Sequence, residues 1–391
     1  MHNPTVTPAK IMVVTGEASG DMHGAKLVLA MRALSPHLSF AGMGGIELER
    51  AGVSMLFDAA KIAVVGVTEV LSHLGDILQA RRTLLEHMRK ERPDLLILID
   101  YPDFNLLLAA KAKKLGIPIL YYVSPQIWAW RSGRVHAIRR LADRVAVILP
   151  FEQEFYARYG YQVDFVGHPL ADTVEPGVDR QTFVARYGLD PQKKLIGLLP
   201  GSRRKEIASL LPGFLEAAAL LNRAYPGRYT FLIPQASTID RRVLEQNGLQ
   251  QYQHSLDIRV LKEDRYTLMA ASDAVVAASG TVILELALLN TPTVVAYRIS
   301  PLTYFLGRLL IRKLQFFSLV NLIGGRAIVP ELLQDAVTPE RIAKELTRLL
   351  EDQAARSAML EGLAEVRARL GGPGASARAA AIALSMLNSC R

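Results

Sequence analysis

Carboxylates that directly follow apolar strands are the first candidates for chemistry in this sequence. The segment I-D-Y-P-D-F-N places Asp100 at the carboxyl end of a strand-like run and Asp103 in the following turn. A carboxylate at that position can take a proton from a hydroxyl, so we favour Asp100 as a general base. Asp103 can equally cap the next helix, and Glu17 and Asp21, on a neighbouring loop, are rivals. His168, in G-H-P-L after a later strand, is a further catalytic candidate that can instead be structural.

A strand–turn–helix corner in the second half of the chain suits an anion. The segment L-P-G-S-R follows an apolar strand and opens a helix. Gly201 and Ser202 would expose backbone N–H groups, and Arg203 would add a fork of donors suited to phosphate. The cations that follow in this first turn oppose the helix dipole, which favours an anion site over a solvated turn.

A second corner, S-G-T-V-I-L-E, also follows a strand. Ser279, Gly280 and Thr281 can cap the helix and face a phosphate. Glu285 lies one turn further along, where its carboxylate could accept hydrogen bonds from ribose hydroxyls. The alternative is an ordinary helix cap with a solvent-exposed Glu. Two such corners in one half of the chain predict a site for a nucleoside diphosphate.

Glycine-rich turns occur in the first half of the chain as well. T-G-E-A-S-G-D contains Ser19 and Gly20, and A-G-M-G-G contains Gly44 and Gly45. Glycines let the backbone approach a ligand, but neither turn has the dinucleotide or P-loop signature. We treat these four residues as candidates for a ligand-binding loop, with tight turns of an ordinary α/β fold as the alternative.

Both tryptophans lie in S-P-Q-I-W-A-W-R, which also follows a strand. Gln126 and Trp128 are ligand-contact candidates there, and aromatic packing between domains is an equal alternative. The sequence has no H-E-x-x-H, D-x-D or G-x-S-x-G motif, and Cys390 is its one cysteine. We therefore expect no metal site and no disulfide framework.

Apolar strands and helical patterns alternate along most of the chain. Near-continuous apolar strands between helices predict parallel sheets buried on both faces. The polar segment at residues 172–179 is the predicted linker. We expect an α/β fold of two Rossmann-like domains facing a cleft, at residues 1–172 and 173–391, with a helical C-terminal tail that can pack back on the first domain.

Composition narrows the class of protein. The chain has 391 residues, is 50% hydrophobic, and carries a net charge of +9. These values exclude a disordered chain, and we expect neither a secretory signal nor a membrane-spanning helix. A basic, slightly hydrophobic protein suggests an anionic partner, either nucleic acid or a membrane. No nucleic-acid-binding signature occurs, so nucleic acid is not expected as a partner.

Two apolar stretches are candidates for contact with a membrane or with acyl chains. They cover residues 62–78 and 302–323, and the second carries cations four residues apart on one helix face. A buried amphipathic helix is the alternative for each. The candidate residues are Val65, Val67, Val70, Leu71, Phe305, Arg308, Arg312 and Phe316.

Taken together, these motifs resemble the bacterial lipid-A-disaccharide synthase family, inverting glycosyltransferases of the GT-B class. The resemblance covers residues 13–334 in family order. The matching stretches are GEASGDMHG, AGMGG, VGVTEVL, IDYPDFN, SPQIWAWR, ILPFE, FVGHPL, LLPGSRRKEI, SGTVILELAL and NLIGGRAIVPELLQ.

The resemblance implies a reaction and its substrates. A UDP-activated 2,3-diacylglucosamine would be the donor, and 2,3-diacylglucosamine 1-phosphate (lipid X) the acceptor, giving a β-1,6-linked disaccharide 1-phosphate and UDP without a metal or other cofactor. Asp100 would be the base, the second domain would hold the nucleotide, and the first would hold the acceptor. Asn321 and Arg326 would lie near the sugar or diphosphate.

The resemblance also implies a location. Such enzymes act in the cytoplasm of Gram-negative bacteria, peripherally bound to the anionic lipid of the inner membrane's inner face. A homodimer is left open. Alternatives are another GT-B enzyme acting on UDP-GlcNAc, either a non-lipid transferase or a 2-epimerase, and a non-enzymatic basic protein that binds a membrane surface. An NAD-dependent dehydrogenase is disfavoured by the missing fingerprint.

Overall fold

The computed structural model describes residues 8–62, 74–299 and 315–389, and the chain divides into two compact units. The first unit contains Met1–Asp172 and Leu370–Arg391, and the second contains Thr173–Arg369. The division after residue 172 lies where the linker was expected. The C-terminal tail is split: residues 370–391, expected as part of the second domain, group with the first unit.

The first unit is built on a seven-stranded parallel sheet in the order β3-β2-β1-β4-β5-β6-β7. The central strands β1, β4 and β5 are almost wholly apolar and buried, as a sheet covered on both faces requires. The strands are β1 (Lys10–Val14), β2 (Ser39–Gly44), β3 (Ser54–Asp58), β4 (Leu95–Ile99), β5 (Ile119–Tyr122), β6 (Arg144–Val147) and β7 (Asp164–Phe165).

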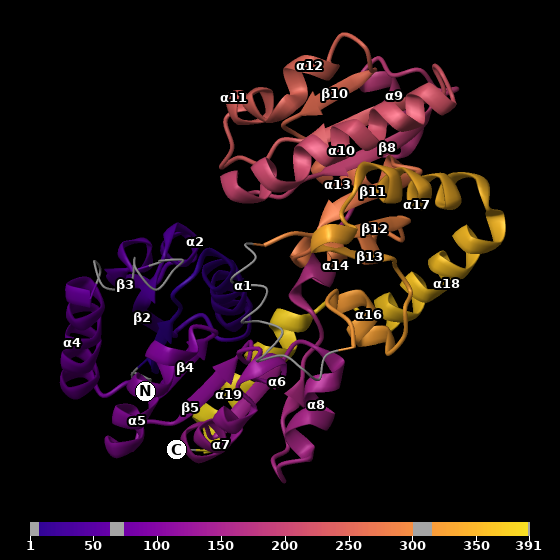
Figure 1. The fold of residues 1–391 in the computed structure, drawn as a ribbon. Helices are drawn as coiled ribbons and strands as arrows, with labels where there is room; N and C mark the ends of the chain where they lie inside the picture. The colour runs from indigo at the N-terminus through magenta and orange to yellow at the C-terminus, as the bar shows by residue number, and fades with distance from the viewer. Residues whose placement is uncertain (1–7, 63–73, 300–314, 390–391) are drawn as a thin grey trace. The chain divides into compact units, whose positions relative to one another are not determined.

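Helices cover both faces of this sheet (Figure 1). On one face α1 (Ala18–Leu34) packs against α19 (Ala375–Ser389), and both contact β4. On the other face α4 (Leu74–Glu91) and α5 (Pro102–Lys114) pack together. The other α-helices among the described residues of this unit are α2 (Ile46–Arg50), α6 (Ile127–Trp130), α7 (Val135–Leu141) and α8 (Pro150–Ala157). The last helix of the chain therefore completes a layer of the first unit.

The second unit repeats this design with a six-stranded parallel sheet in the order β10-β9-β8-β11-β12-β13. Its strands are β8 (Lys194–Leu199), β9 (Tyr229–Pro234), β10 (Ile258–Leu261), β11 (Ala274–Ala278), β12 (Thr293–Tyr297) and β13 (Glu331–Leu333). Its helices are α9 (Arg180–Arg186), α10 (Arg204–Ala224), α11 (Arg241–Leu244), α12 (Gln250–Tyr252), α13 (Arg265–Ala271), α14 (Thr281–Leu288), α16 (Leu319–Gly324), α17 (Pro339–Glu351) and α18 (Gln353–Arg369). The predicted fold class, two Rossmann-like domains with parallel sheets, is confirmed.

Each sheet has one place where the strand order reverses. In the first it lies between the neighbouring strands β1 and β4, and in the second between β8 and β11. Ligands of open α/β sheets bind beyond the carboxyl ends of such strand pairs. The loops after these four strands begin with Thr15, Asp100, Pro200 and Ser279, so the sequence motifs lie where the fold favours a ligand.

One element differs from the sequence expectation. A-G-M-G-G was interpreted as a turn, but residues 41–44 lie inside strand β2. Gly42 is required there because a Cβ would collide with the backbone oxygen of Val13 on β1. Gly42 of this motif therefore serves close packing between two strands.

Candidate active site

Asp100 lies directly after β4 in an unusual backbone conformation. Asp100, Tyr101 and Val123, at the ends of neighbouring strands, all have left-handed φ values of 45°, 46° and 56°. The turn is held because the Asp100 N–H donates to the Val123 oxygen at 3.2 Å. The Asp100 carbonyl in turn accepts from the hydroxyl of Tyr121 at 2.7 Å and from Nδ2 of Asn105 at 2.8 Å. Such strained non-glycine residues persist where surrounding contacts fix them, and they cluster at functional sites.

The environment of Asp100 makes its carboxyl a better base. Burial, together with the negative charge of Glu17, raises the pKa of Asp100 to about 6, against a lowering effect of the Tyr101 backbone N–H. A carboxylate with that pKa is ionised at neutral pH and accepts a proton more readily than an ordinary Asp. Glu17 itself is exposed at the start of α1 and acts here through its charge.

A pocket of about 210 Å³ opens beside Asp100, and Gln126, Arg131 and Arg134 also line it. Asp103, the rival carboxylate, is largely exposed and forms ion pairs with both arginines. Its contact with Arg131 is 3.4 Å, and it also contacts Arg134 Nη2. Asp103 would have to give up these cations to act as a base, so the structure favours Asp100.

The glycine turn after β1 brings α1 close to the strand ends. A Cβ on Gly16 would collide with the ring of Tyr101, and one on Gly20 would collide with Thr15 Oγ1. Gly20 is buried and serves this packing, whereas Ser19 is exposed in the first turn of α1 and remains available to a ligand.

Asp21 has a structural role that excludes it as the base. Its buried carboxylate accepts backbone hydrogen bonds from Gly45 at 2.7 Å, Glu47 at 2.9 Å and Leu48 at 3.2 Å. These three donors form the start of α2, so Asp21 ties the first glycine turn to the second. Gly44 and Gly45 leave room for this carboxylate, because a Cβ on either would approach it within 3.0 Å.

His168 is buried and held by its own turn. Its Nδ1 accepts from the Leu170 backbone N–H at 3.2 Å, and its backbone N–H donates to the Leu370 oxygen at 2.8 Å. Burial and the neighbouring His23 lower its pKa to about 3, so the imidazole is neutral at physiological pH. His168 joins the C-terminal segment to the first unit, which favours the structural alternative.

Gln126 and Trp128 have different surroundings. Gln126 is exposed and lines the Asp100 pocket. Trp128 packs edge-on against Phe151, with ring centroids 4.9 Å apart. The residue after Phe151 is Glu152, a buried carboxyl that the sequence motifs did not single out. The structure thus assigns Gln126 to the pocket and Trp128 to packing.

Glu152 is a buried carboxyl whose surroundings favour its protonated form. Burial raises its pKa to about 8, although the backbone N–H of Leu149, which donates to Oε2 at 3.0 Å, acts in the opposite direction. The sequence signal for this role is a Glu at the third position of a helix that begins with Pro150 after a strand, where a carboxyl can turn back to the preceding N–H.

In the second unit, the L-P-G-S-R corner already holds a carboxylate. Gly201 has a φ of 105°, and the Ser202 N–H donates to Glu206 Oε2 at 3.1 Å. Arg203 contacts Glu206 Oε1 at 2.9 Å and is otherwise largely exposed. The predicted anion donors are therefore present, and in this structure the chain's own Glu206 engages them.

At the second corner, the start of α14 is exposed, and Glu285 already has hydrogen-bonding and ionic partners. Gly280 and Thr281 are exposed at the start of α14, with Ser279 half-buried before them. Glu285 is buried rather than exposed: it forms an ion pair with Arg265 and accepts from the Tyr266 hydroxyl at 3.3 Å. A carboxylate has further lone pairs, so a ribose contact remains open to it.

Asn321 and Arg326 both have partners within the chain. Asn321 is buried, and its side chain donates to Val329 and Glu331 and accepts from the N–H groups of Ile328 and Val329, at 2.7–2.9 Å. Its amide capacity is filled by its own chain, so its role here is to hold the segment before β13. Arg326 is exposed and paired with Glu365 at 2.9 Å.

Most membrane candidates lie outside the described residues. Val65, Val67, Val70 and Leu71 are among them, as are Phe305, Arg308 and Arg312. Phe316 is described and half-buried. Among the described helices, none is both long and apolar enough to cross a membrane.

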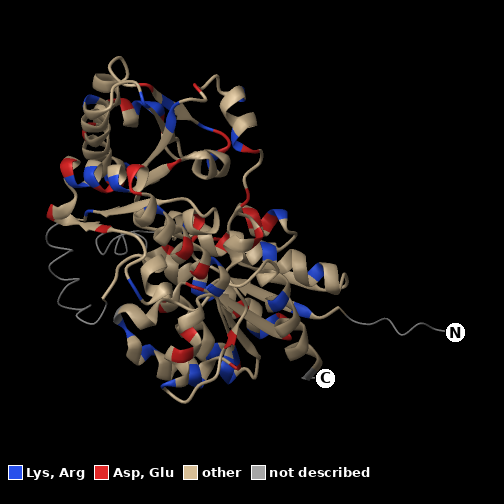
Figure 2. Ribbon diagram, turned by 90° about the vertical axis from the view of Figure 1, so that its right-hand side faces the viewer, with Lys and Arg blue, Asp and Glu red and all other residues tan. Residues whose placement is uncertain are grey.

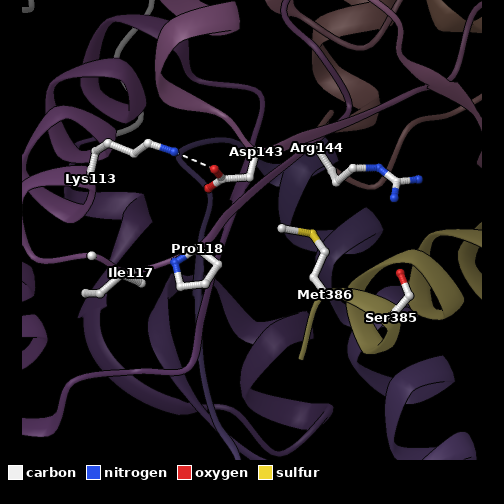
Figure 3. Close-up of a pocket in the computed structure, with 8 residues that line it drawn as sticks. Lys113, Ile117, Pro118, Asp143, Arg144, Ser385 and Met386 are labelled. Carbon is white, nitrogen blue, oxygen red and sulfur yellow. Dashed lines mark hydrogen bonds and ion pairs between the residues drawn. The ribbon is translucent and has the colours of Figure 1, made fainter. Parts of the chain in front are cut away.

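A larger pocket, of about 410 Å³, lies elsewhere in the first unit (Figure 3). Its lining includes Lys113 and Asp143, which form an ion pair, together with Arg144 and Met386 of α19. These residues surround the amino ends of β5 and β6, opposite the strand ends that carry Asp100. Among residues that the structure describes, no group of three or more His, Cys, Asp or Glu side chains could hold a metal ion.

Solved structures share this fold at low sequence identity. A UDP-GlcNAc 2-epimerase from Neisseria meningitidis, solved with UDP-GlcNAc, superposes with a TM-score of 0.65 over 96% of this chain and 100% of that one, at 13% identity. MurG from Acinetobacter baumannii gives a TM-score of 0.61 over 97% and 100% of the two chains, at 16% identity. At such identities the likeness shows the fold alone.

Sequence relatives give the family. The model of the lipid-A-disaccharide synthetase family matches residues 11–383. A lipid-A-disaccharide synthase from Geobacter metallireducens is 47% identical over 99% of this chain and all of its own length, and one from Myxococcus xanthus is 49% identical over 97% and 98%. The resemblance inferred from the motifs is confirmed, and the chain belongs to the lipid-A-disaccharide synthase family of glycosyltransferases.

Proposed function

We propose that this enzyme transfers 2,3-diacylglucosamine from its UDP derivative to the 6-hydroxyl of lipid X, with inversion at the anomeric carbon. The observation that carries the proposal is Asp100, a carboxyl with a raised pKa that follows β4, one of the two strands at the switch point. Asp100 lines a pocket formed by the segments after β4 and β5. Family membership supports the choice of donor and acceptor.

In the proposed step, Asp100 takes the proton from the acceptor hydroxyl as its oxygen attacks the donor's anomeric carbon. A bond forms between that oxygen and the anomeric carbon, and the bond from this carbon to the diphosphate oxygen breaks. The electron pair leaves with UDP. Attack on the face opposite the leaving group inverts the anomeric centre and gives the β-1,6 linkage. The proton remains on Asp100 until solvent removes it.

The leaving diphosphate needs positive charge and hydrogen-bond donors. The Ser202 N–H, the Arg203 guanidinium and the exposed start of α14 at Gly280 and Thr281 are suited to this role. We propose that they stabilise UDP without a metal, and that Glu285 binds the ribose. Glu206 would then move aside when the diphosphate arrives.

We also propose that the enzyme works at the inner face of the inner membrane, where its acylated substrates reside. The net charge of +9 supports attraction to anionic lipid. Among the described residues, cationic and anionic side chains intermingle within each unit (Figure 2). Arg308, Arg312 and the apolar residues around them are the proposed contact.

The deciding experiment is incubation of the purified chain with UDP-diacylglucosamine and lipid X, followed by mass analysis of the product. A disaccharide 1-phosphate is expected, and its absence would contradict the proposal. A parallel incubation with UDP-GlcNAc alone tests the epimerase alternative, which predicts a changed sugar without any acceptor. A protein that only binds membranes would show no saturable UDP binding.

A further inference from the structure

Two arginines line the Asp100 pocket, and neither takes part in the proposed proton transfer or in binding of the UDP diphosphate. Arg131 and Arg134 follow the short helix α6, and both line the pocket together with Asp100 and Gln126. The Arg134 side chain is only 17% exposed, whereas that of Arg131 is 45% exposed. A guanidinium as buried as that of Arg134 needs an anionic partner.

We propose that Arg131 and Arg134 form a subsite for a phosphate monoester, the anomeric phosphate of the acceptor sugar. The inference rests on the proposed function, because that function makes the acceptor a sugar 1-phosphate. The subsite specifies which part of the acceptor Arg131 and Arg134 recognise, and how the pocket selects a phosphorylated acceptor.

The present partner of the two arginines is an anion that can leave. The Asp103 carboxylate contacts both guanidinium groups, and its side chain is 77% exposed. An exposed carboxylate loses little when it turns back to water, because water hydrates the released charge. A phosphate monoester offers the same fork geometry with more charge and more oxygens. Asp103 therefore holds the arginines in place until a stronger anion replaces it.

The shape of the substrate agrees with the composition of the pocket. In a hexose 1-phosphate, the anomeric carbon and the carbon that bears the hydroxymethyl group both flank the ring oxygen. One edge of the ring thus presents the phosphate and the reacting hydroxyl together. A pocket that holds this edge needs an anion binder beside a base, and this one has Arg131 and Arg134 beside Asp100.

The size of the pocket supports a headgroup rather than a whole lipid. Its volume of about 210 Å³ lies below the roughly 300–1,000 Å³ of sites that enclose whole drug-sized ligands. A sugar phosphate would occupy it while the acyl chains extend outside.

The charges of the pocket allow a base and an anion site to coexist. Unpaired guanidinium groups next to Asp100 would favour its ionised form and weaken it as a base. With Asp103 paired to the arginines, burial and Glu17 dominate the pKa of Asp100. Replacement of Asp103 by the substrate's phosphate would preserve this neutralisation, so the base keeps its strength in the complex.

The test compares two acceptors, lipid X and the same diacylglucosamine without its phosphate. We expect Arg131→Ala and Arg134→Ala to raise KM for lipid X roughly 10- to 100-fold while changing kcat/KM for the unphosphorylated acceptor by no more than about twofold. Arg134→Lys should also lose much of the discrimination, since an ammonium lacks the fork. Arg140→Ala, an exposed arginine of α7, is the matched control and should behave as the wild type.

Several results would overturn the inference. Equal losses with both acceptors would show that the arginines support the fold or the chemistry rather than the phosphate. A raised KM for the donor with an unchanged KM for lipid X would assign them to the UDP diphosphate. If the wild-type chain forms no disaccharide, the proposed function fails. The subsite can be tested independently of turnover by measuring the affinities of lipid X and of its unphosphorylated analogue by calorimetry. Equal affinities would reject the phosphate subsite.

Discussion

Glu206 Oε2 accepts a hydrogen bond from the Ser202 backbone N–H at 3.1 Å, at the corner where we place the diphosphate. Its other oxygen contacts Arg203, so one carboxylate engages both predicted anion donors. A diphosphate would have to displace it. We expect Glu206→Gln to tighten UDP binding about two- to fivefold, because it removes a competing negative charge.

Isothermal calorimetry with UDP measures this effect. Glu216→Gln, an exposed glutamate further along α10, is the control and should leave the affinity unchanged. Weaker UDP binding in Glu206→Gln would instead mean that Glu206 prepares the loop for the nucleotide.

Arg203 is expected to supply the main cation for UDP. Replacement by Ala should weaken UDP affinity roughly tenfold or more, because a charge-assisted contact to phosphate is lost. Arg204→Ala is the matched control, since Arg204 is the next residue and is exposed. Equal UDP affinities in wild type and Arg203→Ala would remove Arg203 from the site.

Replacement of Asp100 should reduce turnover without weakening nucleotide binding. Asp100→Ala is expected to lower kcat by roughly 10²-fold or more, as loss of a general base does. UDP affinity should stay close to that of the wild type, because the nucleotide site is assigned to the second unit. Turnover near the wild-type rate would reject Asp100 as the base.

The pH dependence of kcat/KM reports on the same carboxyl. The base works ionised, and its pKa is raised to about 6. Activity should therefore be full above this pH and fall roughly tenfold per unit as the pH decreases through it. Glu17→Gln removes the charge that helps to raise this pKa, so its acidic limb should move to lower pH. Glu49→Gln, on the exposed side of α2, should not move the limb, and a profile unaltered by Glu17→Gln would disprove the coupling.

Asn321 is expected to matter for stability. Asn321→Ala leaves the buried N–H groups of Ile328 and Val329 without acceptors, which should cost roughly 2–4 kcal/mol of unfolding free energy. Urea unfolding followed by circular dichroism should show a lower midpoint, whereas the exposed Gln251→Ala should not. An unchanged midpoint with weaker UDP binding would restore Asn321 as a ligand contact.

The sequence by itself located the strand ends that carry the site. Apolar runs followed by Asp100, by Gly201 and by Ser279 each became a strand and a loop at a switch point. This worked because parallel strands between helices bring all their carboxyl ends to one edge, so a local motif after a strand already specifies its place. The parallel direction of the strands in both sheets follows from the same alternation, whereas their order was decided by the folded structure.

Only the tertiary structure distinguished among chemically identical carboxylates. The sequence favoured Asp100 as the base but left Asp21 and Asp103 as rivals. In the structure, Asp21 accepts three backbone N–H groups, and Asp103 pairs with two arginines. Partners of this kind come from segments that are distant along the chain. A residue's type and spacing therefore predict what it can do, and its neighbours in space decide which capacity is already used.

The same reason explains Asn321 and the end of the chain. The four hydrogen bonds of Asn321 depend on the path of residues 328–331, which no local pattern encodes. Residues 370–391 follow the second unit in sequence, yet α19 packs on α1 of the first. A helix with an apolar face can bury it wherever a matching surface lies within reach, so its pattern predicts burial while the folded chain selects the surface.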